Sequence, residues 1–184
     1  MDGVIRTRVG YAGGTGDNPT YQDLGDHSEA LQVDFDPGTI TYTDLLAIFW
    51  KAHKPFSRSW SRQYRNALFF HDEGQRAAAE ESRAVIAEKR GKRVRTALEP
   101  LGNFYRAEAY HQKYRLRSRP DFLRDLTRCY PAARALTDST AAARLNGYLG
   151  GHGSWAQLQR EVDGLGLRGE TRSQLVALVR RRDE

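Results

Sequence analysis

Cysteine is almost absent from this chain, since Cys129 is the only one among its 184 residues. A single thiol excludes an internal disulfide framework and a zinc site built from several cysteines. A thiol cycle that ends in an intramolecular disulfide needs two sulfur atoms. These 184 residues therefore cannot complete such a cycle alone.

Long apolar runs are also missing. No stretch approaches the roughly 20 apolar residues that cross a bilayer, and the first residues lack the basic-then-apolar pattern of a secretory signal. Hydrophobic residues make up 39% of the chain, enough for one domain with a core. We therefore expect a cytoplasmic protein with no membrane partner. The spacing of its histidines suggests no ligand set, so we expect no bound metal.

Positive charge is in excess, with a formal net charge of +6. Residues 83–119 hold eleven Lys and Arg against three Glu, a local net charge of +8. Such a stretch attracts phosphates or an acidic partner, although a solvated basic face is the commoner case. No nucleic-acid-binding motif accompanies it, so we consider nucleic acid an unlikely partner.

Alternating residue patterns predict strands and helices up to about residue 119, followed by short helices. Thr43 is a suitable N-cap for a first helix, Asp72 for a second, and Gly91 suits the left-handed position where that second helix ends. Another helix is expected to begin near Ala107. The predicted strands cover 4–9, 31–35, 67–70 and 94–98, and the predicted helices include 43–51, 72–91 and 172–182.

Four ordered segments resemble the A-type peptide methionine sulfoxide reductases. Together they span roughly residues 3 to 116, and four motifs in one order are far more specific than a single glycine-rich loop. The resemblance implies a ferredoxin-like two-layer α/β sandwich over residues 1–119, with residues 120–184 as a helical C-terminal extension. The segments are Gly10-Tyr11-Ala12-Gly13-Gly14 with Asn18-Pro19-Thr20-Tyr21, His27-Ser28-Glu29-Ala30, Gln63-Tyr64-Arg65-Asn66-Ala67, and Phe104 to Tyr114.

This resemblance also implies an oxidoreductase that repairs proteins under oxidative stress, by reducing the S epimer of methionine sulfoxide to methionine. In the family a cysteine thiolate attacks the sulfoxide sulfur, an acid protonates the oxygen, and the resulting sulfenic acid is resolved by a second thiol. Thioredoxin or another thiol reductant then restores the enzyme, and no bound cofactor is required.

Three residues match the family's site positions. Glu29 matches the general acid, which must hold its proton at working pH, as low-polarity surroundings favour. Tyr21 and Tyr64 match the two phenols that bind the sulfoxide oxygen as hydrogen-bond donors. Taken singly, each is more often an ordinary surface residue, and only the surrounding motifs favour the functional interpretation.

The chain departs from the family pattern in several places. The Gly-Cys-Phe-Trp motif that normally precedes a segment like Gly3-Val4-Ile5 is missing, and with it the nucleophile. Asp26 stands where a glycine is usual, and 57–61 replaces a segment that commonly holds an aspartate. Cys129 is a candidate resolving thiol for an upstream cysteine, although a structural cysteine is commoner.

Three functional hypotheses follow. The leading hypothesis is a reductase that is active in a longer, full-length form, with this chain alone inactive because it lacks the nucleophilic cysteine. The alternative is a non-catalytic relative that binds a sulfoxide or an oxidised peptide through Tyr21, Glu29 and Tyr64. A basic protein that binds nucleic acid through residues 83–119 is the least favoured.

Overall fold

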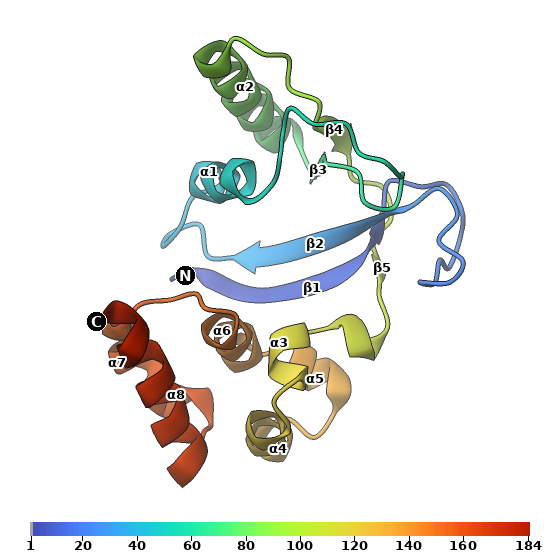
Figure 1. Cartoon of the computed structure of the whole chain (residues 1–184). Coiled ribbons are helices and arrows are strands. Elements are labelled where there is room, and N and C mark those ends of the chain that lie inside the picture. Colours follow the sequence, from blue (N-terminus) through green and yellow to red (C-terminus); the bar gives the residue numbers. More distant parts are fainter. Residues whose placement is uncertain (1) are drawn as a thin grey trace. The chain divides into compact units, whose positions relative to one another are not determined.

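A computed structural model describes residues 2–184 of the chain (Figure 1). Strands and helices alternate in the first part, and the C-terminal region is helical, so the expected α/β fold with a helical C-terminal region is confirmed. The elements are β1 (Val4–Ala12), β2 (Ser28–Phe35), α1 (Tyr42–Ala52), β3 (Ala67–Phe70), α2 (Glu73–Arg90), β4 (Ala97–Pro100), β5 (Tyr105–Arg106), η1 (Ala109–His111), α3 (Tyr114–Arg117), α4 (Pro120–Cys129), α5 (Ala133–Asp138), α6 (Thr140–Leu149), α7 (Trp155–Glu161), η2 (Val162–Leu165) and α8 (Gly169–Asp183).

The chain folds into two compact units. The mixed unit comprises Val9–Leu31 and Asp36–Ala107, and the helical unit comprises the chain up to Arg8, Gln32–Phe35 and Glu108–Glu184. Both units take segments from distant parts of the sequence. This division therefore does not test the predicted domain ranges 1–119 and 120–184, which stay a prediction.

Two small sheets organise the strands. One has the order β2-β1-β5, and its antiparallel β1–β5 pair aligns Gly10 with Arg106 and Tyr11 with Tyr105. The other joins β3 and β4 in parallel, with Leu68 opposite Leu98. Since parallel neighbours need a crossover, α2 connects β3 to β4.

Local signals explain the two helices of the mixed unit. Helix α1 begins at a capping box in which Thr41 accepts from the amide of Asp44, while the Asp44 side chain accepts from the amide of Thr41. The predicted cap at Thr43 is therefore wrong, since only Thr41 has an acidic residue three positions on. Helix α2 is capped by Asp72 and ends at Gly91 with φ 59°, both as predicted. Trp50 and Ala79 pack these helices against one core.

Two other predictions need correction. The strand expected over 94–98 forms over Ala97–Pro100 instead. The single helix expected from Ala107 is divided into η1 and α3, because Lys113 adopts a left-handed conformation (φ 53°) that interrupts it. The Lys113 ammonium group donates to the carbonyl oxygen of Thr7 at 2.6 Å and to its hydroxyl at 2.8 Å, which holds this conformation in place.

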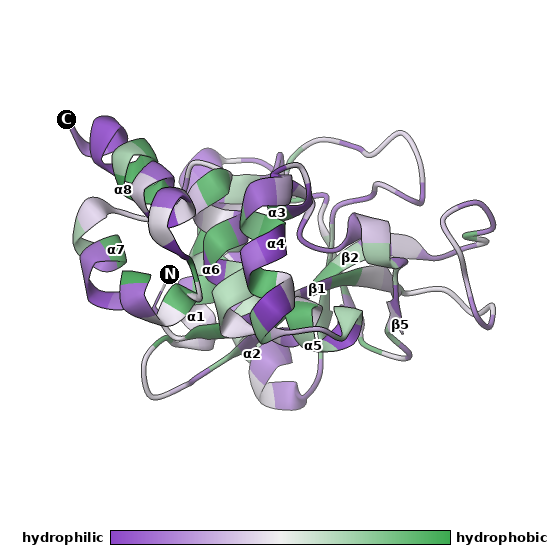
Figure 2. Ribbon diagram, turned by 90° about the horizontal axis from the view of Figure 1, so that it is seen from below, coloured by the Kyte–Doolittle hydropathy of each residue, from purple (hydrophilic) through white to green (hydrophobic). Residues whose placement is uncertain are grey.

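The helical unit has its own core. Leu116, Phe122, Leu126, Leu145 and Leu175, from helices α3, α4, α6 and α8, are completely buried in it. Figure 2 shows both hydrophobic and hydrophilic residues on each of these helices. Within residues 2–184, no helix is both long and apolar enough to traverse a membrane.

Candidate functional site

The hydroxyl groups of Tyr21 and Tyr64 meet in the mixed unit. Tyr21 comes from the loop between β1 and β2, and Tyr64 from the segment just before β3. Their oxygen atoms lie 3.3 Å apart, so one hydroxyl donates to the other. The residues are 39% and 42% exposed, which leaves both phenols accessible to a ligand.

Glu29 joins this pair through Gln63. The Gln63 amide nitrogen donates to the Glu29 carboxylate at 2.8 Å and to the Tyr64 hydroxyl at 3.1 Å. The backbone amide of Glu29 donates to the carbonyl oxygen of Gln63 at 2.9 Å. All three residues that the sequence singled out therefore lie in one hydrogen-bonded group.

Gln63 is the residue of this group to which sequence reasoning assigned no role. Gln63 directly precedes Tyr64 in the third motif, and this position is the one feature of the sequence that could have indicated a role in the site. Its amide can donate to a carboxylate and a phenol at once, because the nitrogen carries two hydrogens.

The hydrogen bond with Tyr21 raises the pKa of Tyr64 to about 12, with smaller contributions from burial and from the negative charge of Glu29. A phenol with a raised pKa stays protonated at neutral pH. Tyr64 therefore keeps the hydrogen that it would donate to an acceptor oxygen.

An ion pair and two hydrogen bonds hold the segment before β3. Ser28 donates from its hydroxyl to the carbonyl oxygen of Arg62 at 2.9 Å and accepts from Arg65 at 2.7 Å. The Arg65 guanidinium forms a two-fold ion pair with Glu99, whose pKa it lowers through the hydrogen bond. These contacts fix Tyr64 relative to β2, because Arg62 and Arg65, which flank Gln63 and Tyr64, both bind Ser28 of that strand.

His27 and Asp26 fix the glycine-rich loop. His27 is 1% exposed; it accepts at Nδ1 from the amide of Gly14 and donates from Nε2 to the carbonyl oxygen of Gly16. Asp26 accepts from the amide and hydroxyl of Thr15, and the amide hydrogen bond lowers the Asp26 pKa. The aspartate that departs from the family pattern thus ties down the loop that leads to Tyr21.

No group of three His, Cys, Asp or Glu able to hold a metal occurs within residues 2–184.

Trp60 adds an apolar surface beside the phenols. Its ring centre lies 5.3 Å from that of Tyr64, and the residue is 84% exposed. Nearby, Ser59 accepts from the amide of Asn66 at 3.0 Å, so its hydroxyl already has a structural partner. The segment 57–61, which stands where the family commonly has an aspartate, therefore contributes an indole.

Cys129 lies elsewhere in the fold. It is the last residue of α4, in the helical unit, and it is exposed. Its sulfur faces Gly166, where an added Cβ would lie 3.1 Å from it. Its role as a resolving thiol stays a prediction.

Two family models and several known proteins match this chain. A family model described as peptide methionine sulfoxide reductase matches residues 1–144, and one described as the helical domain of selenoprotein methionine sulfoxide reductase A matches residues 133–178. The chain is 41% identical over 167 residues to a peptide methionine sulfoxide reductase of Drosophila melanogaster, covering 90% of this chain and 67% of that protein. It is 46% identical over 126 residues to the enzyme MsrA of Methanothermobacter thermautotrophicus, covering 62% of this chain and 74% of that protein.

Solved structures show the same likeness. Reduced Mxr1 from Saccharomyces cerevisiae matches with a TM-score of 0.60 at 30% identity, over 65% of this chain and 74% of that one. Methionine sulfoxide reductase A of Corynebacterium diphtheriae matches with a TM-score of 0.53 at 30% identity, over 64% and 65% of the two chains. The chain therefore belongs to the peptide methionine sulfoxide reductase family.

Proposed function

We propose that the full-length form of this protein is a peptide-methionine (S)-S-oxide reductase, which converts methionine sulfoxide to methionine by thiol chemistry. The observation that carries the proposal is the hydrogen-bonded group of Tyr21, Tyr64, Gln63 and Glu29. It combines two phenol donors with one carboxyl group, the set that an S=O bond needs for cleavage.

In this proposal the sulfoxide oxygen accepts from both phenols. The Tyr21–Tyr64 hydrogen bond is then exchanged for two hydrogen bonds that the phenol hydroxyls donate to the substrate. Glu29 delivers the proton that lets the oxygen leave the substrate. Gln63 donates to Oε1 of Glu29, which leaves the other carboxyl oxygen for this transfer.

The thiol part of the reaction is supplied in the full-length form. A cysteine thiolate attacks the sulfoxide sulfur and forms a bond to it. The protonated oxygen then moves to the cysteine sulfur while the bonds from the substrate sulfur to that oxygen and to the cysteine break, which releases methionine and leaves a cysteine sulfenic acid. A second thiol condenses with it to a disulfide and releases water, and thioredoxin or another thiol reductant reduces that disulfide. Protein repair in the cytoplasm under oxidative stress is the setting that this chemistry favours.

We expect the 184-residue chain alone to be inactive, because its only cysteine is Cys129. The same observation supports the alternative, in which the protein is a non-catalytic module that binds a sulfoxide or an oxidised peptide. The binding side chains are present in these 184 residues, but Cys129 is the only thiol. The two hypotheses differ in whether the full-length form turns over substrate.

The test is an assay of the full-length form and of the 184-residue chain with each epimer of N-acetyl-methionine sulfoxide and dithiothreitol. We expect the full-length form to reduce the S epimer only, and the 184-residue chain to form no methionine above background. In the full-length form, Glu29→Gln should lower the rate by about 10²–10⁴. Glu73→Gln, at an exposed position in the first turn of α2, is the matched control.

Each contrary outcome has a clear meaning. A preference for the R epimer, or full activity of Glu29→Gln, would contradict the proposal. A full-length form that binds the S epimer in an NMR titration without turnover would favour the non-catalytic alternative. Turnover by the 184-residue chain that Cys129→Ser abolishes would show that the expectation of inactivity is wrong.

A further inference from the structure

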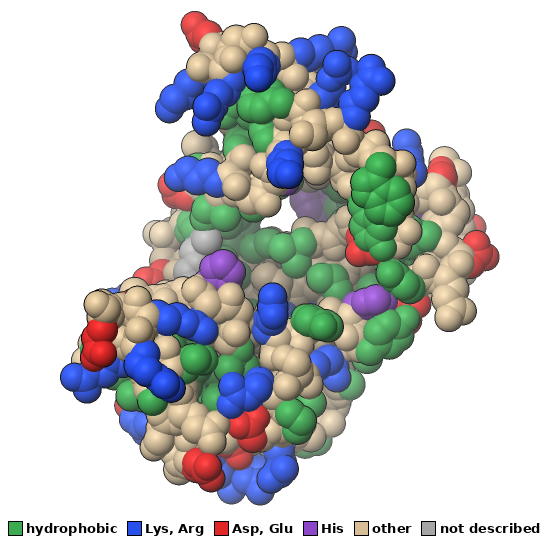
Figure 3. All heavy atoms as spheres, in the orientation of Figure 1, with side chains coloured by type: hydrophobic (Ala, Val, Ile, Leu, Met, Phe, Trp, Pro, Cys, Tyr) green, Lys and Arg blue, Asp and Glu red, His purple; other side chains and the backbone are tan. Residues whose placement is uncertain are grey.

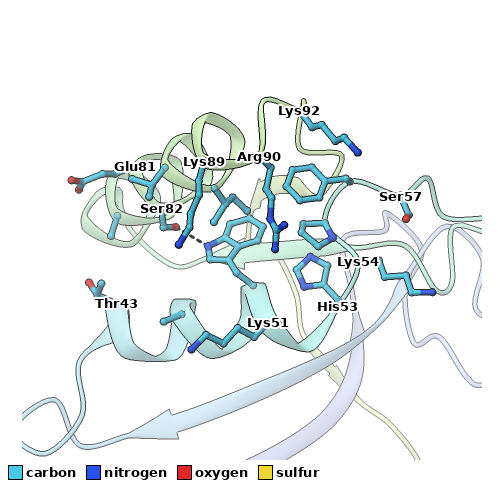
Figure 4. Close-up of a pocket in the computed structure, with 17 residues that line it drawn as sticks. Thr43, Lys51, His53, Lys54, Ser57, Glu81, Ser82, Lys89, Arg90 and Lys92 are labelled. Atoms are coloured by element: carbon cyan, nitrogen blue, oxygen red, sulfur yellow. Dashed lines mark hydrogen bonds between the residues drawn. The ribbon is translucent and has the colours of Figure 1, made fainter.

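A cleft of about 1100 Å³ lies between α1 and α2 in the mixed unit, and the 53–57 segment lines it as well (Figure 4). Its apolar lining includes Trp50, Phe56, Val85 and Ile86. Val85 is 56% exposed, so its side chain presents apolar surface to the cleft. None of Tyr21, Glu29 and Tyr64 lines this cleft, so it is separate from the candidate site.

Hydrogen bonds hold the walls of the cleft in place without a ligand. The Trp50 indole on α1 donates to the hydroxyl of Ser82 on α2 at 2.9 Å, which links the two walls. His53 donates from Nδ1 to the carbonyl oxygen of Phe49 at 2.7 Å and accepts at Nε2 from the Thr96 hydroxyl at 2.8 Å. Because the walls are already in place, a ligand would not have to order them on binding.

Positive charge surrounds the apolar lining. Five of the lining residues are cationic, and Glu81 is the one acidic residue among them. Figure 3 shows Lys and Arg side chains gathered around hydrophobic ones over α1 and α2. Within residues 2–184, no ion pair forms to any of the five cations, which are Lys51, Lys54, Lys89, Arg90 and Lys92.

The cleft also has the length of a short helix. Its wall on α2 runs from Ala78 to Arg90, which at 1.5 Å per residue is about 18 Å, or three helical turns. A groove between two helices with apolar positions along it receives the apolar face of a third helix. Unpaired cations at its rim then select acidic residues on the polar face of that helix.

We propose that this cleft is a docking site for an acidic amphipathic helix of another protein. The occupant follows from the combination of features, because each simpler ligand uses only part of them. Nucleic acid would pair with the cations but leave the apolar side chains of Phe56, Val85 and Ile86 in contact with water. A fatty acid would fill the apolar lining with its chain, but its one carboxylate would neutralise only part of the cationic rim.

The test uses a fluorescein-labelled synthetic peptide of about 14 residues, four helical turns, with leucine on one face and glutamate on the other. Fluorescence anisotropy with the 184-residue chain should show saturable binding that weakens as salt is raised. A peptide with serine in place of leucine, and another with lysine in place of glutamate, should each bind at least about tenfold more weakly, because either change removes one of the two complementary features.

Paired variants locate the site. Val85→Asp places a carboxylate in the apolar lining, so it should weaken binding by about tenfold or more. Ala84→Asp adds the same charge to α2 at an exposed position outside the lining and should leave binding nearly unchanged. The double variant Lys54→Glu with Lys89→Glu should also weaken binding, whereas Arg93→Glu, exposed and outside the lining, should have a small effect.

Circular dichroism and thermal unfolding of each variant confirm that it is folded. The proposal would be overturned if no saturable binding occurs, if the serine peptide binds as tightly as the leucine peptide, or if each variant and its control behave alike. Tight binding of a DNA oligonucleotide that Val85→Asp leaves unchanged, with no binding of the peptide, would assign the surface to polyanions instead. None of these outcomes depends on reductase activity.

Discussion

The hydroxyl oxygens of Tyr21 and Tyr64 lie 3.3 Å apart, although 43 positions separate the two residues in the sequence. Each phenol is exposed, and each is held by backbone that other contacts fix: the His27 loop for Tyr21 and the Arg65–Glu99 ion pair for Tyr64. Two donors at this spacing can share one acceptor atom, which is what a sulfoxide oxygen requires.

The Tyr64 pKa, raised to about 12, predicts that the free energy of unfolding falls at alkaline pH. The unfolded chain ionises a tyrosine near pH 10, so the contribution of this phenol to the free energy of unfolding is complete below pH 10. It is lost as the pH rises from 10 to about 12. Absorbance titration at 295 nm should therefore lose one late-ionising phenol in Tyr64→Phe. The exposed Tyr114→Phe is the control, and an identical loss in that variant would contradict the assignment.

Trp60 is expected to bind the apolar part of the substrate. Trp60→Ala in the full-length form should raise KM for N-acetyl-methionine sulfoxide several-fold and leave kcat nearly unchanged, because the indole would bind substrate and transition state equally. Trp60→Phe should restore most of the affinity. Stability should not change, since the side chain is 84% exposed. A fall in kcat at unchanged KM would show that the indole acts differently.

Gly13 is expected to tolerate no side chain. Its φ is +75°, and an added Cβ would lie 2.6 Å from the Phe69 ring and 2.7 Å from the Arg65 guanidinium. Gly13→Ala should therefore lower the free energy of unfolding by about 2–4 kcal/mol through strain and overpacking. Gly16→Ala, which meets no atom within 4 Å, should change it little. Urea unfolding of the two variants compares them directly.

Asp125 is expected to stabilise the helical unit from within its core. It is 6% exposed and accepts from the Thr171 hydroxyl at 2.5 Å and the Arg168 amide at 3.1 Å, so it joins α4 to the start of α8. The Thr171 hydrogen bond lowers its pKa, so its contribution is complete above the unfolded value near 4 and is lost as the pH falls through the lower folded pKa.

Asp125→Asn should reduce the free energy of unfolding at pH 7 by about 1–3 kcal/mol, because the charge-assisted bonds are lost. The difference from the unsubstituted protein should shrink towards pH 2. Asp163→Asn, whose side chain is 79% exposed, is the control. A difference that stays constant from pH 7 to pH 2 would contradict the role of the carboxylate charge.

Cys129→Ser tests the resolving thiol. In the full-length form we expect the first turnover to be intact, since methionine leaves before a second thiol acts. If Cys129 resolves the sulfenic acid, that species should persist in the variant and react with dimedone, and steady-state turnover with thioredoxin should fall. Loss of the first turnover, measured as methionine formed per enzyme without reductant, would show that Cys129 acts earlier.

The sequence by itself determined the features that depend on near neighbours in the chain. The strand at Ala67–Phe70 and the helix from its Asp72 cap to Gly91 were predicted with their correct ends, because caps and left-handed glycines act within three or four residues. The four ordered motifs were sufficient to predict family membership. They also identified the three candidate site residues, but could not show how these contact one another.

Only the tertiary structure decided the features that depend on distant contacts. The helix expected from Ala107 is interrupted because Lys113 reaches back to Thr7, 106 positions away. Gln63 connects Glu29 to Tyr64 only once β2 and the segment before β3 lie side by side. Helical hydrogen bonds form between residues four positions apart, so the local sequence can predict them. The contacts of Lys113 and Gln63 join residues that are far apart in the chain and form only when the tertiary structure forms, so no local sequence pattern predicts them.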